Sequence, residues 1–160
     1  MSRAAKVSFQ KTLLVRDCCV CLHVQRASRA LARRFDQVLR PLGLTSGQFS
    51  LLMSLNRPQA PTVSAVAALL AMDRTTLTAA LKPLRQRGLV KVAINLADRR
   101  NRLLTLTSKG QSLLAHAVPV WQRTHAEVEG LIPDGDPDTF RINLRALSSA
   151  LRRSPIIPPH

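Results

Sequence analysis

Hydrophobic residues recur at every third or fourth position over most of this 160-residue chain, which indicates a mainly helical protein. The first such stretch, from Leu13 to Leu42, predicts one long amphipathic helix, and Pro41 and Gly43 mark its end. Its apolar stripe comprises Val20, Val24, Ala27, Leu31, Phe35, Val38 and Leu42. A second helix begins after Thr45, where Thr45 and Gln48 have the spacing of a capping box.

Two short helices follow, separated by a three-residue break at Ala71, Met72 and Asp73. Thr62 is placed to cap the first of them and Asp73 the second, and Gly88 supplies the left-handed residue that ends helices. The second helix turns polar and basic side chains outward. Two short helices joined by a tight turn, with such a second helix, are typical of a helix-turn-helix.

The hydrophobic period changes after Gly88. Residues 89–96 and 102–107 read as two strands of a hairpin, whose tip holds Arg99, Arg100 and Arg102. A hairpin with a basic tip directly after a recognition-type helix describes a winged helix. Two further helices begin near Thr107 or Ser108 and at Asp136–Pro137, and residues 154–160 form a proline-rich flexible tail. The predicted fold is therefore mainly α with a small β-hairpin wing.

Composition supports one folded domain over residues 1–160. Hydrophobic residues make up 46% of the chain, and the longest apolar run, 65–72, is too short to span a bilayer. We find no signal-peptide pattern at the start. The three cysteines, Cys18, Cys19 and Cys21, lack the spacing of a disulfide framework. These features favour a cytoplasmic protein with no membrane segment.

Positive charge changes this picture most. The chain carries 24 Lys and Arg against 9 Asp and Glu, a net charge of +15. Residues 1–40 and residues 73–110 each hold nine basic and two acidic side chains, whereas residues 111–160 are balanced. Two basic segments around a neutral remainder favour a polyanionic partner, with nucleic acid ahead of an anionic membrane surface.

Catalytic and metal-binding motifs find little support. The chain has no His-Glu-x-x-His, Gly-x-Ser-x-Gly, Walker A or dinucleotide-binding pattern. The stretch "DGDPD" lacks the glycine and the final glutamate of a calcium loop. Cys18 and Cys21 make one C-x-x-C pair without a second pair, which argues against zinc. We expect no enzyme activity, no metal and no cofactor.

Two stretches carry a family resemblance. "DRTTLTAALKPLRQRGLVKVAINLADRRNRLLTLTSKGQSLL" and "RPLGLTSGQFSLL" resemble the MarR (multiple-antibiotic-resistance regulator) family of winged helix-turn-helix transcriptional regulators. The family's wing pattern, Asp-x-Arg, five residues, then Leu-Thr, stands here as Asp98-Arg99-Arg100 through Leu106-Thr107. The resemblance covers roughly residues 13–151.

The resemblance implies a homodimer in which residues 12–44 and 111–153 form a helical dimerisation region and residues 45–110 a winged helix-turn-helix lobe. It implies a repressor that binds double-stranded DNA at a palindromic operator. We assign base or phosphate contact to four residues at the start of the recognition helix: Arg74, Thr75, Thr76 and Thr78. The remaining DNA-contact candidates are phosphate contacts Lys82 and Arg85, wing residues Arg99, Arg100 (minor groove) and Arg102, and Asp98 as a brace for a wing arginine.

Two kinds of effector remain open. Family members release DNA on binding a small molecule, commonly an anionic aromatic compound. The groups suited to one are His23, Arg26, His116, Trp121 and His125. The peroxide-sensing branch instead uses a cysteine in the first helix, and Cys21 matches its position. That branch activates its thiolate with tyrosines, whereas this chain has none and places Phe35 at one such position. An architectural DNA-binding protein without sequence preference is the alternative of another class.

Overall fold

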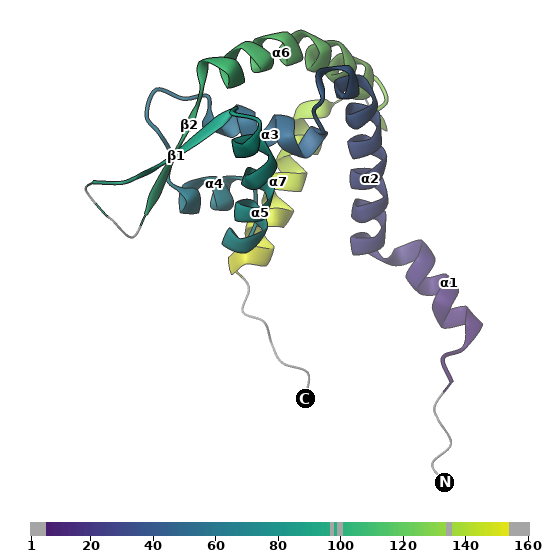
Figure 1. The fold of residues 1–160 in the computed structure, drawn as a ribbon. Helices are drawn as coiled ribbons and strands as arrows, with labels where there is room; N and C mark the ends of the chain where they lie inside the picture. Colours follow the sequence, from purple (N-terminus) through teal and green to yellow (C-terminus); the bar gives the residue numbers. More distant parts are fainter. Residues whose placement is uncertain (1–5, 97, 99–100, 134–135, 154–160) are drawn as a thin grey trace. The chain divides into compact units, whose positions relative to one another are not determined.

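The computed structural model describes residues 6–96, 98, 101–133 and 136–153, and it divides the chain into two compact units, Met1–Val118 and Pro119–His160 (Figure 1). The first unit holds α1 (Phe9–Cys18), α2 (Val20–Leu39), the 3-10 turn η1 (Arg40–Leu42), α3 (Ser46–Leu55), α4 (Val63–Leu69), α5 (Arg74–Gln86), β1 (Val90–Ile94) and β2 (Arg102–Leu106). The unit boundary falls within α6 (Ser108–Glu129), and α7 (Pro137–Arg153) belongs to the second unit. This confirms a mainly helical fold with one two-stranded hairpin.

The prediction of a single helix from Leu13 to Leu42 is wrong, because the helix is interrupted at Cys19 (Figure 1). Cys19 has extended backbone angles, φ −75° and ψ 103°, and its Sγ accepts a hydrogen bond from the Leu22 N–H at 3.4 Å. The Cys19 thiol thus caps a new helix, α2, directly before the apolar stripe that begins at Val20. The last turn is also separate, since residues 40–42 form a 3-10 turn that ends at Gly43.

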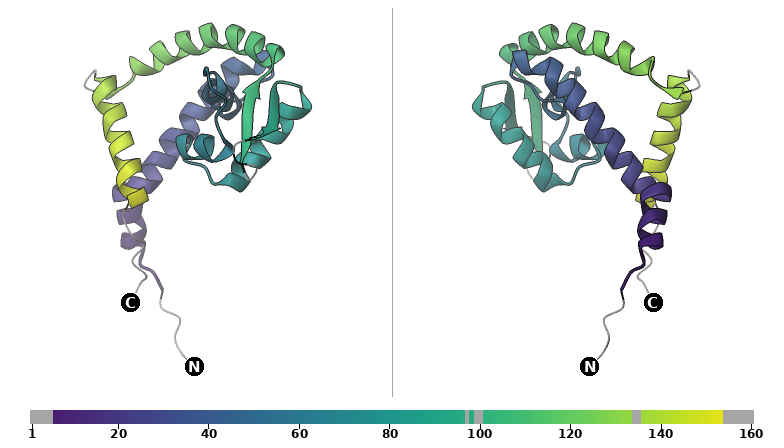
Figure 2. Two further views of the ribbon diagram at one scale, coloured as in Figure 1. Left: turned by 90° about the vertical axis from the view of Figure 1, so that its left-hand side faces the viewer. Right: turned by 90° about the vertical axis from the view of Figure 1, so that its right-hand side faces the viewer.

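Helices α3, α4 and α5 pack around the hairpin as the core of the winged lobe (Figure 2). Its central side chains are at most 1% exposed: Leu52, Val66, Leu77, Leu84, Leu89 and Leu104. The capping box at α3 is formed, with Thr45 Oγ1 accepting from the Gln48 N–H and Gln48 Oε1 accepting from the Thr45 N–H. Thr62 caps α4 as predicted. Local capping therefore fixes where the helices of the lobe begin.

The hairpin is antiparallel, with Val90 opposite Leu106 and Ile94 opposite Arg102. A bridge between Thr62 and Leu103 attaches the segment before α4 to β2. The start of α6 lies directly against Leu89, the residue before β1: a Cβ on Gly110 would come 2.2 Å from the Leu89 carbonyl oxygen. Glycine is required there, because any larger residue would push α6 away from the hairpin.

In the second unit, ion pairs join the end of α6 to α7. Arg141 donates to the carboxylates of Glu129 and Asp138, the latter at 2.7 Å. Asp136 caps α7 through the Thr139 N–H at 3.0 Å, as the sequence predicts for the Asp136–Pro137 pair. The apolar stripe of α7 is exposed, with Phe140 and Leu144 each at 42% and Leu147 at 40%.

Candidate nucleic-acid interface

Helices α4 and α5 are bent by 105° relative to each other, which is the geometry of a helix-turn-helix. The tight turn between them contains Ala71 in the left-handed region at φ 53°. Helix α5 buries Leu77, Leu81 and Leu84 and exposes its opposite side. The outermost positions, spaced by four, three and four residues, are Thr75, Ala79, Lys82 and Gln86, all exposed.

The N-terminus of α5 is held by Asp73. One carboxylate oxygen accepts the Thr76 N–H at 2.8 Å and the other accepts the Thr76 hydroxyl at 2.6 Å. These hydrogen bonds, the side-chain one first, lower the pKa of Asp73 below its ordinary value. The aspartate therefore stays ionised at neutral pH and fixes the first turn of the helix.

The four threonine and arginine candidates at this end of α5 are all exposed, but they differ in what their polar atoms do. The Thr78 hydroxyl donates to the Arg74 carbonyl at 2.7 Å, and the Thr76 hydroxyl donates to Asp73. Both threonines therefore offer mainly their methyl groups and oxygen lone pairs to a partner. Arg74 and Thr75 are the first two residues of α5, and both side chains are exposed.

A basic hollow of about 630 Å³ lies between α5 and β1. It is lined by Lys82, Arg85, Gln86, Val90, Lys91, Val92 and Ala93. The sequence predicts Lys82 and Arg85 as DNA contacts, and the structure places Gln86 and Lys91 in the lining of the same hollow. The helical spacing from Thr75 indicates Gln86, whereas Lys91 comes from a strand and joins the hollow only through the fold.

The C-terminal end of α5 is hydrogen-bonded to Gly43, which follows α2 and the 3-10 turn η1. Arg87 Nη1 donates to the Gly43 carbonyl at 2.7 Å, across 44 positions of sequence. Lys109 Nζ donates to the Arg87 carbonyl at 3.0 Å. The recognition-type helix is thus fixed at both ends, by Asp73 within the helix-turn-helix and by Arg87 to the turn after α2.

The wing is described only in part. Arg102 begins β2 and is exposed, whereas Arg99 and Arg100 lie outside the described residues. Asp98 accepts a hydrogen bond from the Asn101 side-chain amide at 2.6 Å, and its carbonyl accepts the Asn101 N–H at 2.9 Å. Asp98 is therefore hydrogen-bonded to Asn101, and its role as a brace for a wing arginine stays a prediction.

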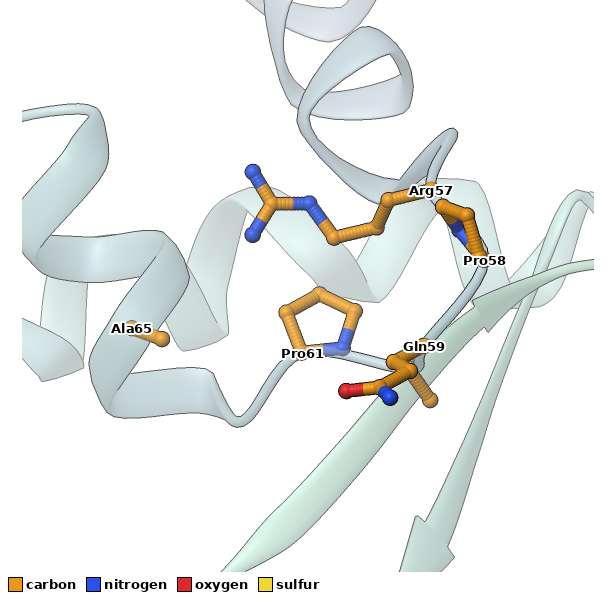
Figure 3. A pocket seen from close by; sticks show the side chains of 6 residues that line it. Arg57, Pro58, Gln59, Pro61 and Ala65 are labelled. Carbon is orange, nitrogen blue, oxygen red and sulfur yellow. The ribbon is translucent and has the colours of Figure 1, made fainter.

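A second hollow, of about 500 Å³, lies at the loop between α3 and α4 (Figure 3). Its lining is Arg57, Pro58, Gln59, Ala60, Pro61 and Ala65. The Arg57 side chain extends over Pro61 in the direction of α4 (Figure 3). It is a shallow, wide-open surface with a single charged group.

Comparison with known proteins agrees with this geometry. A sequence profile described as the MarR family matches residues 44–101. The organic hydroperoxide resistance transcriptional regulator of Bacillus subtilis is 30% identical over 101 residues, which are 63% of this chain and 69% of that protein. The chain belongs to the MarR family.

Solved structures of this family superpose on the chain. The crystal structure of the M. tuberculosis transcriptional regulator MosR in complex with DNA has a TM-score of 0.76 at 39% identity, covering 84% of this chain and 96% of that one. A mutant of E. coli MarR in complex with operator DNA has a TM-score of 0.74, covering 84% and 97%; at 23% identity it shows the fold alone. The chain is a MarR-family DNA-binding transcriptional regulator.

The effector candidates of this MarR-family chain lie in both units. His23 Nε2 is 3.1 Å from the Asp17 carbonyl, across the break at Cys19, and Arg26 is exposed. His116 Nδ1 is 2.8 Å from the Ser112 carbonyl in its own helix. In the second unit, Trp121 stacks on His125 at 4.4 Å between ring centroids, and His125 reaches Glu129 at 3.1 Å. Their role in binding an effector stays a prediction.

The cysteines are not equivalent. Cys18 and Cys21 are exposed, and Cys19 is half-buried. The Cys21 Sγ accepts a hydrogen bond from Gln25 Nε2 at 3.3 Å, while the Cys19 Sγ caps α2. Among the described residues, no three His, Cys, Asp or Glu side chains are grouped so that they could hold a metal ion.

In the part of the chain that the structure describes, no single helix is long and apolar enough to span a membrane. Helices α4 and α5 satisfy a length and composition test only together, as the bent pair of the helix-turn-helix.

Proposed function

We propose that this regulator is a homodimeric repressor that binds a palindromic operator in the cytoplasm. The observation that carries the proposal is the exposed, basic face of α5 beside a basic hairpin, in a chain similar to a DNA-bound regulator. A dimer presents two copies of α5, so its half-sites are spaced by about one helical turn of DNA. Bound at a promoter, such a dimer excludes RNA polymerase.

Each contact residue has a distinct role in this proposal. Arg74 and Thr75, at the exposed start of α5, contact base edges in the major groove. Thr76 and Thr78 present methyl groups, which pack on thymine. Lys82 and Arg85 contact phosphates, which orient the protein without reading sequence. Arg100 enters the minor groove, and Arg99 and Arg102 are further DNA contacts of the wing.

The homodimer is supported by apolar side chains that a single chain leaves uncovered. Along α2, exposure falls from 62% at Val20 to 40% at Leu31 and 0% at Leu39, so only the end next to the lobe is covered. Helix α7 exposes Phe140, Leu144 and Leu147 by 40% or more. Contiguous apolar stripes of this kind mark protein interfaces, and a second copy of the chain offers the same two stripes.

The test compares operator DNA with random DNA across a range of salt concentrations. A sequence-specific repressor binds its operator about 1,000-fold or more tightly than random DNA, as expected for such proteins. An architectural protein binds both equally with the same salt dependence. Equal affinities at every salt concentration would therefore replace the repressor with the architectural alternative.

The proposed signal for release is a small anionic aromatic compound. His23, Arg26, His116 and Trp121 supply cationic and aromatic groups, and the Trp121–His125 stack offers a flat apolar surface. We expect aromatic carboxylates to raise the melting temperature and to release the operator. The paired variants are Trp121→Leu and, as a control on the same helix, Arg123→Gln; release that both variants retain unchanged would remove Trp121 from the site.

A thiol-based peroxide sensor is the second candidate, favoured by the similarity to the organic hydroperoxide regulator of B. subtilis. The exposed Cys21 thiolate would attack the peroxide O–O bond, giving a sulfenic acid and an alcohol. Cys21→Ser should then abolish peroxide-induced release, and Cys18→Ser, also exposed, should retain it. If Cys19→Ser alone abolishes release, the half-buried helix cap is the sensor instead of Cys21.

A further inference from the structure

The basic hollow between α5 and β1 is lined by one basic residue, Lys91, that has no role in the proposed function. Lys82 and Arg85 line it from α5, and Lys91 lines it from β1. Lys91 is exposed and stands opposite Thr105 in the hairpin. The hollow is therefore lined by basic residues from both the helix and the strand, which a single helix face cannot provide.

None of the seven residues that line this hollow is acidic. Lysine and arginine donate hydrogen bonds and accept none, and Gln86 adds an amide donor on the helix wall. Val90 and Val92 line the hollow from the same strand as Lys91. Such a site suits a compact anion with several acceptor oxygens, and a phosphodiester is one.

The fold favours a phosphate of DNA, rather than a free anion, as the occupant of this hollow. Lys82 and Gln86 belong both to the hollow and to the outermost stripe of α5, which also contains Thr75 and Ala79. A duplex contacted through that stripe therefore lies at the open side of the hollow. The phosphates of a bound duplex reach the hollow at a high effective concentration, whereas a free anion must be captured from solution.

We propose that Lys91, together with Lys82 and Arg85, holds a phosphate of the DNA strand that passes between α5 and the wing. The inference rests on the proposed operator binding and adds Lys91 as a positioning residue. Lys91 sets the depth at which α5 sits in the groove without reading sequence. Its contribution is therefore equal on operator and on random DNA.

The experiment measures affinity for operator and random duplexes by fluorescence anisotropy at several salt concentrations. Lys91→Gln should weaken both by the same factor and reduce the slope of log affinity against log salt by about 0.9. Lys11→Gln on α1 removes the same charge outside the hollow and should leave the slope unchanged. Lys91→Arg should retain the wild-type slope.

The outcomes separate this inference from the proposed function. If wild-type protein discriminates operator from random DNA but Lys91→Gln keeps the wild-type slope, the phosphate contact is wrong and operator binding stands. A change confined to the operator would make Lys91 a base-reading residue and overturn the inference. Unchanged DNA binding with loss of inorganic phosphate binding, measured by calorimetry, would make the hollow a small-anion site instead. If wild type does not discriminate, the operator proposal itself fails.

Discussion

The winged lobe and the terminal helices use the same residue types in opposite ways. In the lobe, leucines on α5 and β2 such as Leu84 and Leu104 are fully buried within one chain. On α7, Leu144 and Leu147 follow an equally regular helical spacing yet remain 42% and 40% exposed. The lobe buries its own core, whereas α7 leaves its apolar stripe exposed. We propose that this difference separates DNA recognition by the lobe from assembly through the helices.

The largest expected effect is loss of a lobe core side chain. Leu84→Ala should lower the free energy of unfolding by about 2–5 kcal/mol, because it leaves a cavity at a fully buried position. Denaturant titration monitored by circular dichroism measures this change. Leu144→Ala, at an exposed position of α7, should cost less than half as much in the same titration at a protein concentration low enough for the chain to be monomeric. Equal losses of unfolding free energy in the two variants would contradict the difference between the lobe and α7.

The next prediction concerns assembly. Leu144→Glu places a charge in the exposed stripe of α7 and should raise the dimer dissociation constant by on the order of 100-fold, since an unpaired charge would be buried in the interface. Sedimentation equilibrium measures it. Arg145→Glu is the control, because Arg145 neighbours the stripe and is also exposed. A monomeric wild type would remove the basis of the comparison.

A substitution at the start of α6, where it meets the residue before the hairpin, should lower the stability of the lobe without removing a proposed DNA contact. Gly110→Ala brings a Cβ to 2.2 Å from the Leu89 carbonyl. We expect a loss of about 1–3 kcal/mol in unfolding free energy, as in other overpacked sites. Gly47→Ala is the matched control, because the space around its Cβ is open. Equal stability of the two variants would contradict the close approach.

A smaller effect is expected at the link between α5 and the turn after α2. Arg87→Met removes the hydrogen bond to the Gly43 carbonyl and should cost about 0.5–1.5 kcal/mol of stability. Operator affinity should fall while its salt slope stays at the wild-type value, because Arg87 orients α5 and does not contact phosphate. A reduced slope would place Arg87 on DNA.

The smallest effect is the pH dependence of the α5 cap. Hydrogen bonds from Thr76 lower the pKa of Asp73, so its contribution is complete above the ordinary aspartate pKa of about 3.9 and is lost as pH falls through the lower folded value. Asp73→Asn retains a capping side chain that does not titrate. The difference between wild type and Asp73→Asn in thermal melts should therefore be constant from about pH 5 to 8 and change only below about pH 4. A change near neutral pH would contradict the cap.

The parts of the fold that the sequence predicted are those that depend on local interactions. The caps at Thr45, Thr62, Asp73 and Asp136 join residues three positions apart, so the residue types alone indicate them. The hairpin and the helix-turn-helix follow from changes in hydrophobic period. The break at Cys19 was not predicted, because cysteine is not among the residue types that usually cap helices, although the regular apolar stripe begins only at Val20.

For the candidate DNA-binding site, the sequence likewise predicted the local features but not the contacts between distant segments. Exposure of Arg74, Thr75, Lys82 and Arg85 follows from their places on an amphipathic helix. The link from Arg87 to Gly43 and the approach of Lys91 to α5 depend on how distant segments pack, which no local pattern contains. The engagement of the Thr76 and Thr78 hydroxyls within α5 likewise requires side-chain geometry.

The central claim is that two copies of α5, presented by a homodimer, read a specific DNA sequence. Repeated selection of bound duplexes from a random pool, followed by sequencing, tests it directly. We predict enrichment of one palindrome whose half-sites are separated by about 10 base pairs from centre to centre. Selection with Arg74→Ala should relax the preference at defined positions of each half-site. A pool that stays random through successive rounds, although the protein binds it, would contradict the claim.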